Sequence, residues 1–173
     1  MDLAAHIRNV PDFPKPGIQF KDITSLLLVP DAFAHVIDTF KARYTAQPID
    51  AIVGIDARGF IFGSALSYAM HLPFVPARKH GKLPGKTIEE SFELEYGTDR
   101  VAIHDDALHA GQRVLILDDL LATGGTALAV ARLIQRLGAE VVEAAFVVEL
   151  PPLNGRKKLE GIPVHSLVEF MVD

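Results

Sequence analysis

The sequence lacks cysteine, and it contains no long uninterrupted run of apolar residues. Without cysteine the chain forms no disulfide and offers no thiolate to a zinc ion, which excludes a disulfide scaffold and a cysteine-ligated zinc domain. No apolar run reaches the roughly 18 residues that a membrane-spanning helix needs. We therefore expect a protein that does not bind a membrane.

Positive charge is also in short supply. The chain has 17 lysines and arginines against 22 aspartates and glutamates, so its formal net charge is -5. An acidic chain argues against a general nucleic-acid binder, because such proteins carry basic surfaces. The opening stretch "MDLAAHIRNVPDF" has no basic region and reaches proline early, unlike a secretory signal peptide. These features predict a cytoplasmic protein with no nucleic-acid partner.

The chain is long enough for one domain with a sizeable core, since it has 173 residues and 49% of them are hydrophobic. Apolar strand-like stretches alternate with stretches that have helical spacing. We predict strands over 49–56, 72–77, 112–119, 139–150 and 162–170, and helices over 31–44, 58–71 and 126–138. The first helix is expected to begin with Asp31 as its cap. This order predicts an α/β fold, a mostly parallel sheet with helices on both faces.

A β-hairpin is expected between the second and third of these strands. It covers residues 91–97 and 99–104 and follows the basic stretch "ARKHGKLPGK" (77–86). Because it interrupts the alternation, we expect a flexible flap rather than a part of the sheet. Polar residues follow several predicted strands, and ligands of open α/β sheets bind beyond the carboxyl ends of strands. These polar groups are Asp56-Ala57-Arg58, Arg78-Lys79 and Asp118-Asp119.

The stretch "VLILDDLLATGGT" (114–126) carries the clearest chemical signal. A buried strand ends in two carboxylates, and a turn of small residues then leads into a helix. Free backbone N–H groups at a helix N-terminus bind anions, and glycines let a phosphate approach closely. Carboxylates instead accept hydrogen bonds from hydroxyl pairs. The pattern matches neither a Walker loop nor G-x-G-x-x-G, and it favours a phosphate with a ribose diol beside it.

This stretch resembles the phosphoribosyl pyrophosphate-binding signature of the type I phosphoribosyltransferases. Further segments are similar, in the same order, to those of the adenine phosphoribosyltransferases: "DFPKPGIQFKDITSLL" (12–27), "ARGFIFG" (57–63), "RKHGKLPG" (78–85) and "ELEYGTD" (93–99). The resemblance implies one type I phosphoribosyltransferase domain over 1–173, with an N-terminal base-recognition segment (1–30) and a flexible catalytic flap (79–103). It also implies transfer of a phosphoribosyl group from 5-phosphoribosyl 1-pyrophosphate to adenine, giving AMP and pyrophosphate in purine salvage, with Mg2+ as cofactor and a homodimer as the assembly.

The resemblance also assigns roles to individual residues. Ribose and 5-phosphate binding would involve Asp118, Asp119, Leu121, Ala122, Thr123, Gly124, Gly125 and Thr126. Pyrophosphate binding would involve Asp56, Ala57, Arg58, Lys79, Lys82 and Tyr96. Adenine binding would involve Gln19, Phe20 and Lys21. Catalysis would rest on Glu95, Arg58, Lys79 and Asp119, with Glu95 taking or guiding the proton that adenine loses.

The pattern departs from that of relatives at two places, and the metal assignment is indirect. Position 57 is alanine where relatives often have serine, and Lys21 stands where many have arginine. Phe20 would cover the adenine ring, although a place in the core is the alternative. Magnesium would be held mainly by the substrate, with Asp118 or Asp119 as the candidate protein ligand. The seven histidines show no metal-ligand spacing.

Two alternatives are left open by the residues. Hypoxanthine-guanine relatives use a lysine and an aromatic side chain near the end of the sheet, and they lack the "FPKPGIQFKD" segment. Residues 162–170 offer no lysine, which favours adenine. The second alternative is a regulator that keeps the pocket as a sensor. Such proteins usually add a nucleic-acid-binding module or a basic face, which a short acidic chain does not provide.

Overall fold

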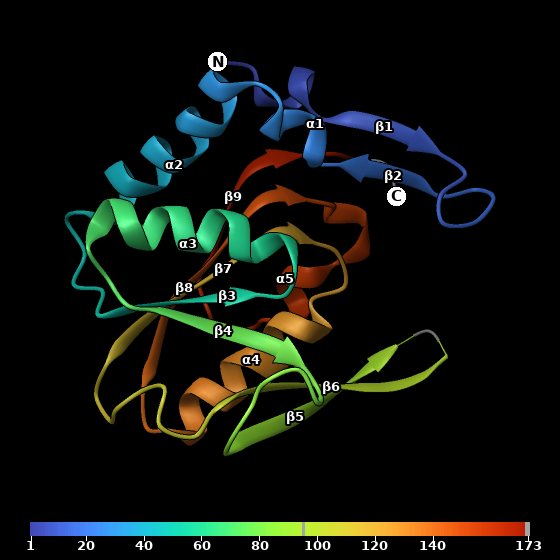
Figure 1. The fold of residues 1–173 in the computed structure, drawn as a ribbon. Coiled ribbons are helices and arrows are strands. Elements are labelled where there is room, and N and C mark those ends of the chain that lie inside the picture. Colours follow the sequence, from blue (N-terminus) through green and yellow to red (C-terminus); the bar gives the residue numbers. More distant parts are fainter. Residues whose placement is uncertain (95, 172–173) are drawn as a thin grey trace.

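The computed structural model describes residues 1–94 and 96–171, and a seven-stranded sheet lies at its centre (Figure 1). The strands are β3 (Ala51–Ile55), β4 (Phe74–Lys79), β5 (Thr87–Leu94), β6 (Gly97–His104), β7 (Arg113–Leu121), β8 (Glu140–Glu149) and β9 (Val164–Glu169). Their order is β5-β6-β4-β3-β7-β8-β9. The five strands from β4 to β9 in this order pair in parallel, so the predicted α/β fold is confirmed.

Helices cover both faces of the sheet. The α-helices are α1 (Thr24–Leu27), α2 (Pro30–Tyr44), α3 (Arg58–Met70), α4 (Gly125–Arg136) and α5 (Gly155–Lys158), and the 3-10 turns are η1 (Leu3–His6) and η2 (Pro151–Leu153). Helices α2 and α3 lie on one face and α4 on the other (Figure 1). Because side chains alternate along a strand, Ile52 joins the core under α3 while Val53 joins the core under α4.

Helix α2 begins one residue earlier than the sequence pattern predicts. Val29 is the residue before its first turn, Pro30 is the first helical residue, and Asp31 lies within the first turn. Proline suits this position because its fixed φ angle matches a helix and its missing N–H has no intrahelical partner there. Asp31 is therefore not the cap, although its negative charge still complements the helix dipole.

The hairpin is part of the sheet, contrary to the prediction that it would stand apart from it. Strand β4 runs two residues past its predicted end, and Arg78 and Lys79 pair with Ala102 and Val101 of the antiparallel strand β6. Val101 and Ile103 of β6 are buried in the core under α4. The burial of these apolar side chains explains why the base of the hairpin extends the sheet.

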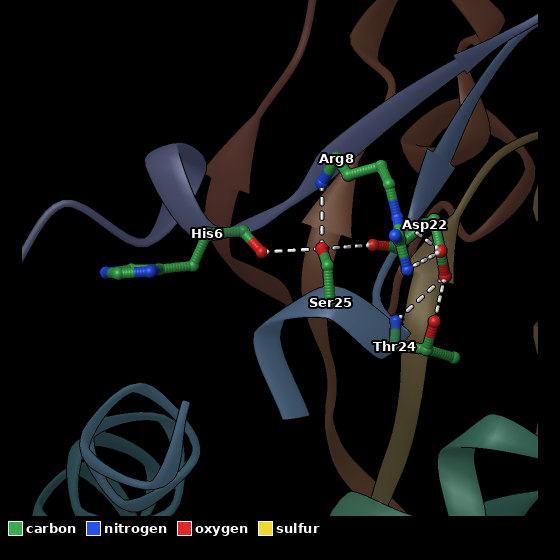
Figure 2. Close-up of polar contacts among 5 residues, drawn as sticks. All are labelled: His6, Arg8, Asp22, Thr24 and Ser25. Carbon is green, nitrogen blue, oxygen red and sulfur yellow. Dashed lines mark hydrogen bonds and ion pairs between the residues drawn. The ribbon is translucent and has the colours of Figure 1, made fainter. Parts of the chain in front are cut away.

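The N-terminal segment forms a small sheet of its own. Strand β1 (Arg8–Pro11) pairs in antiparallel fashion with β2 (Gln19–Asp22), beside the end of β9 in Figure 1. Polar contacts tie its base to α1 (Figure 2). The Ser25 hydroxyl accepts a hydrogen bond from the Arg8 backbone N–H at 2.9 Å and donates one to the His6 carbonyl at 2.7 Å. This sheet is therefore fixed where it leaves the domain.

The same base carries an ion pair between the two strands. The Arg8 guanidinium contacts the Asp22 carboxylate at 3.0 Å, and Thr24 donates both its backbone N–H and its hydroxyl to the same carboxylate. These hydrogen bonds lower the pKa of Asp22, and the hydrogen bond from the Thr24 hydroxyl has the largest effect.

No helix among residues 1–94 and 96–171 is long and apolar enough to cross a membrane.

Candidate active site

One pocket lies at the carboxyl ends of the parallel strands. Asp56 follows β3, Lys79 ends β4 and Asp118 lies near the end of β7, and all three line a pocket of about 260 Å3 together with Thr126. The structure thus brings together predicted residues from three separate segments of the chain. The hairpin closes the pocket on one side with residues that the sequence reasoning did not single out: Phe92, Leu94, Asp99 and Val101.

The turn that follows β7 surrounds a second, smaller pocket of about 110 Å3, and Asp118 lines both pockets. Helix α4 begins at Gly125, so its first backbone N–H groups have no partner within the helix. Gly124 has φ +86°, a left-handed conformation that favours glycine. Such a turn at a helix N-terminus can bind a phosphate. The other predicted residues of the turn, Leu121, Ala122 and Thr123, line this pocket too.

The two adjacent carboxylates differ in their surroundings. Asp118 lines the pocket, whereas the Asp119 side chain is 8% exposed and forms an ion pair with Arg58. Burial raises the pKa of Asp118 well above its usual range, and the negative charge of Asp119 raises it further. The Asp119 backbone N–H, which donates to Asp118 at 2.8 Å, and the Arg58 charge act in the opposite direction. Asp118 thus faces the ligand space, while Asp119 holds Arg58.

The residues predicted for pyrophosphate lie at the ends of β3 and β4. The peptide bond between Asp56 and Ala57 is cis, and the Asp56 carboxylate accepts a hydrogen bond from Arg78 Nε at 3.1 Å. Arg78 also donates to the Lys82 backbone carbonyl at 3.3 Å. The Lys82 side chain is exposed and lines none of these pockets, in contrast to Lys79.

The tip of the hairpin carries the remaining predicted residues. Tyr96 is 84% exposed, and its ring centroid lies 5.8 Å from Lys15 Nζ in the loop between β1 and β2. The hairpin tip and the loop of the N-terminal sheet are therefore in contact. Glu95 lies outside the residues that the structure describes.

Phe20 lies beside Arg58, the ion-pair partner of Asp119, rather than in the main core. It is partly buried, its ring packs edge-on against Phe13 with centroids 5.1 Å apart, and the Arg58 guanidinium lies 5.8 Å from its centroid. Neither of the two core clusters of buried residues includes Phe20. An aromatic ring in this position is available to a planar ligand.

Gln19 and Lys21 flank Phe20 and share one partner that the sequence reasoning missed. Asn9 donates to the Gln19 side-chain oxygen at 2.7 Å and accepts from Lys21 Nζ at 2.8 Å. The Lys21 ammonium also lies 4.9 Å from the Phe170 ring centroid. The register of the small sheet places Asn9 opposite Lys21, and this pairing is not visible in the sequence of either strand.

The base of the hairpin is fixed to helix α4. Arg136 of α4 donates to the Glu89 backbone carbonyl at 2.6 Å and to the Glu90 carboxylate at 3.1 Å. The Glu89 carboxylate is also paired with His80 and with Arg100, the latter at 3.0 Å. Several charged contacts therefore converge on two consecutive residues of β5.

The described residues contain no group of three or more histidines, aspartates and glutamates that could hold a metal ion. A metal at this site would therefore need ligands from a bound molecule. Asp118 is the carboxylate that faces both pockets, so it is the protein group placed to share such an ion.

Comparison with known proteins agrees with this geometry. Residues 22–164 match the family described as phosphoribosyl transferase domain. Adenine phosphoribosyltransferase of Chloroflexus aurantiacus is 56% identical over 169 residues, which cover 98% of each chain. A crystal structure of adenine phosphoribosyltransferase from Thermoanaerobacter pseudethanolicus has a TM-score of 0.95, with 48% identity and 98% of both chains covered.

A further similar structure is that of adenine phosphoribosyltransferase from Saccharomyces cerevisiae, in complex with adenine and an imino-altritol bisphosphate. It has a TM-score of 0.91 and 41% sequence identity, and the match covers 96% of each chain. The similarity extends over nearly the full length of the chain, and it agrees with the fold and with the pocket at the strand ends. The chain therefore belongs to the phosphoribosyltransferases and, within them, to the adenine phosphoribosyltransferase family.

Proposed function

We infer that the chain transfers the phosphoribosyl group of 5-phosphoribosyl 1-pyrophosphate to adenine, giving AMP and pyrophosphate, a reaction of purine salvage. The observation that carries this function is the near full-length identity of 56% with an adenine phosphoribosyltransferase. In the reaction an adenine ring nitrogen forms a bond to the anomeric carbon while the bond from that carbon to pyrophosphate breaks. The nitrogen then loses a proton.

In our proposal the sugar phosphate lies along β7 and the turn after it. The Asp118 carboxylate faces the pocket and accepts hydrogen bonds from the ribose hydroxyls, with Asp119 beside it. The residues from Leu121 to Thr126 surround the 5-phosphate, which binds the free N–H groups at the start of α4. The small volume of this pocket, about 110 Å3, suits a phosphate group.

The pyrophosphate would lie toward β3 and β4, near Asp56, Ala57 and Lys79. The positive charge of Lys79 lines the pocket and would stabilise the negative charge that develops on the leaving group, with Arg58 nearby. The Lys82 side chain is exposed, so a role for it requires movement of the loop that carries it. Tyr96 would contribute from the tip of the hairpin.

Magnesium fits this donor set. Mg2+ is usually bound through one or two carboxylates and substrate phosphates rather than by a complete set of protein ligands. The pocket offers Asp118, with Asp119 as a neighbour, and a bound pyrophosphate would supply the remaining oxygens. When bound, the ion would offset negative charge on the pyrophosphate and orient it.

The hairpin and the N-terminal sheet would enclose the reacting groups and exclude water, because water would otherwise hydrolyse the activated sugar. The contact between Lys15 of the N-terminal sheet and Tyr96 of the hairpin supports this proposal. Glu95 is the proposed acceptor of the adenine proton. On the adenine side, Phe20 would cover the ring, and Gln19 and Lys21 would contribute mainly through their backbone groups.

The outer face of α3 supports a homodimer. Ile61 is 37% exposed and Tyr68 is 84% exposed on this helix, and exposed apolar side chains grouped together mark association sites. Sedimentation should show a dimer, and Ile61→Glu should shift it toward monomer. A monomeric native protein at assay concentration would contradict the proposal.

We also propose a cytoplasmic location, because a highly charged donor does not cross membranes unaided.

Incubation with magnesium, 5-phosphoribosyl 1-pyrophosphate and one base at a time tests the function. We expect AMP and pyrophosphate from adenine and little product from hypoxanthine or guanine. A nucleotide from another base would keep the reaction and overturn the assignment of Phe20 and its neighbours. Binding of the donor without product from any base would indicate a sensor instead.

A further inference from the structure

A segment far along the chain touches the back of the turn that follows β7. Gly155, the first residue of α5, packs so closely that a Cβ placed on it would lie 2.6 Å from the Ala122 carbonyl oxygen. A Cβ on Gly124 would in turn lie 2.8 Å from the Gly155 carbonyl oxygen. Both distances are too short for real atoms, so only glycine fits at either position. The two backbones are in direct contact.

Helix α5 cannot hold this position alone, because it has only four residues and a single helical turn is marginal by itself. Leu159, directly after α5, is buried in the core, and Arg156 supplies a second, polar attachment. Its Nε donates to both carboxylate oxygens of Glu149, at 2.8 and 2.7 Å, and its terminal nitrogen donates to the Val164 carbonyl at 3.0 Å. Arg156 therefore ties α5 to the ends of β8 and β9.

Glu149 is an unusual acceptor for a role in stability alone. Its side chain is 3% exposed, and it receives a further hydrogen bond from the Ser166 hydroxyl at 3.3 Å. Because the Arg156 side chain is half exposed, the ion pair contributes little net stability, but it fixes the relative position of its two partners. The chain just after β8 also contacts the end of β7, where the turn begins, since the Leu150 N–H donates to the Leu121 carbonyl at 3.0 Å.

We propose that Glu149 and Arg156 are positioning residues for the 5-phosphate. Their ion pair holds Gly155 against Ala122 and Gly124, and this contact sets where the N–H groups of the turn point. The proposal rests on the function inferred above, in which this turn binds the 5-phosphate of the donor. Neither side chain touches the substrate in this scheme.

The test compares four variants with the native protein: Arg156→Gln, Arg156→Lys, Gly155→Ala and, as a matched control, Lys157→Gln. For each we would measure kcat, KM for the donor and for adenine, the inhibition constants of ribose 5-phosphate and of pyrophosphate, and the melting temperature. Ribose 5-phosphate probes the turn, whereas pyrophosphate probes the opposite end of the pocket. Only a positioning role affects the two inhibitors differently.

We expect Arg156→Gln to raise KM for the donor and the inhibition constant of ribose 5-phosphate about tenfold, as for the loss of one hydrogen bond to a charged group. KM for adenine and inhibition by pyrophosphate should stay within about twofold of the native values. Arg156→Lys should restore part of the loss. Gly155→Ala should reproduce the effect without a change in charge, and Lys157→Gln should behave as the native protein.

Equal weakening of both inhibitors would overturn the proposal, as would a lower melting temperature with unchanged affinity for ribose 5-phosphate. If Arg156→Gln does not fold, the Gly155→Ala variant tests the proposal instead. Native affinity for ribose 5-phosphate in the folded Gly155→Ala variant would also overturn the proposal. Binding of ribose 5-phosphate is also measured by calorimetry. A native protein that makes no AMP would refute the inferred function, while the calorimetric comparison would still test the positioning role.

Discussion

Replacing Asp119 with asparagine separates the roles of the two adjacent carboxylates. Asparagine keeps the size of the side chain and one acceptor oxygen but removes the charge. Asp119 accepts a hydrogen bond from Arg58 Nε and is nearly buried, so the change is felt by Arg58 and by Asp118. We expect weaker binding of the donor and a changed titration of Asp118.

The size of the first effect follows from the strength of the hydrogen bonds. A hydrogen bond to a charged group contributes about 1.5–3 kcal/mol, and a hydrogen bond between neutral groups contributes about 0.5–1.5 kcal/mol. The difference of about 1–1.5 kcal/mol corresponds to a rise in KM for the donor of roughly 5- to 15-fold. The melting temperature should change little, because Arg58 is about half exposed and such ion pairs contribute less than about 1 kcal/mol.

The second effect is a shift in pH dependence. The pKa of Asp118 is raised first by burial and second by the charge of Asp119, and the asparagine removes the second cause. The pKa of Asp118 should therefore fall. Because the ionised carboxylate accepts the ribose hydroxyls, the acidic limb of kcat/KM for the donor should move to lower pH.

Steady-state kinetics over a range of pH measures both effects. Asp106→Asn is the matched control, since it makes the same chemical change at an exposed position that lines none of the pockets. A change in KM of less than twofold, together with an acidic limb that stays in place, would refute the assignment of Asp119 to the ribose site.

Three further changes test other parts of the site. Asp118→Asn should raise the melting temperature at neutral pH while activity falls. A carboxyl group whose pKa is raised by folding contributes its full stability below its ordinary pKa, and that stability is lost as the pH rises through the raised value. Calorimetry should therefore find no gain in melting temperature in acid. Gly124→Ala should lower the free energy of unfolding by at least about 1–2 kcal/mol, because φ is +86° and the added Cβ would also lie 2.8 Å from the Gly155 carbonyl oxygen; denaturant titration would measure this. Glu95→Gln should lower kcat with little change in KM for the donor, and equal effects on both constants would contradict its role with the adenine proton.

The order of strands and helices could be predicted because it rests on local periodicity. The apolar run of β3 and the helical spacing in α4 are visible in the sequence itself. The pairing of strands could not be predicted, since it depends on contacts between segments that are distant in the sequence. The junction of β4 with β6 is one case, because Arg78 and Lys79 look like the start of a solvated loop until Ala102 and Val101 pair with them.

The candidate site shows the same division. The stretch from Asp118 to Thr126 carries its chemical pattern within a few residues, and the structure places Asp118 and the turn at two adjoining pockets. The different surroundings of Asp118 and Asp119 follow from strand alternation, but the partner Arg58 comes from another element. Gly155 lies about thirty residues beyond the turn, and no local pattern links the two.

The contacts at Glu89 and Glu90 fix the hairpin at its base. Beyond these two residues the β-ladder has four more residue pairs, or rungs, from Ser91–Arg100 to Leu94–Gly97. The number of these rungs, rather than the strength of any contact, then sets how far the tip reaches over the pocket. Two extra residues in each strand would lengthen the hairpin by about 7 Å and carry the tip past the substrate, with every reacting group still in its place.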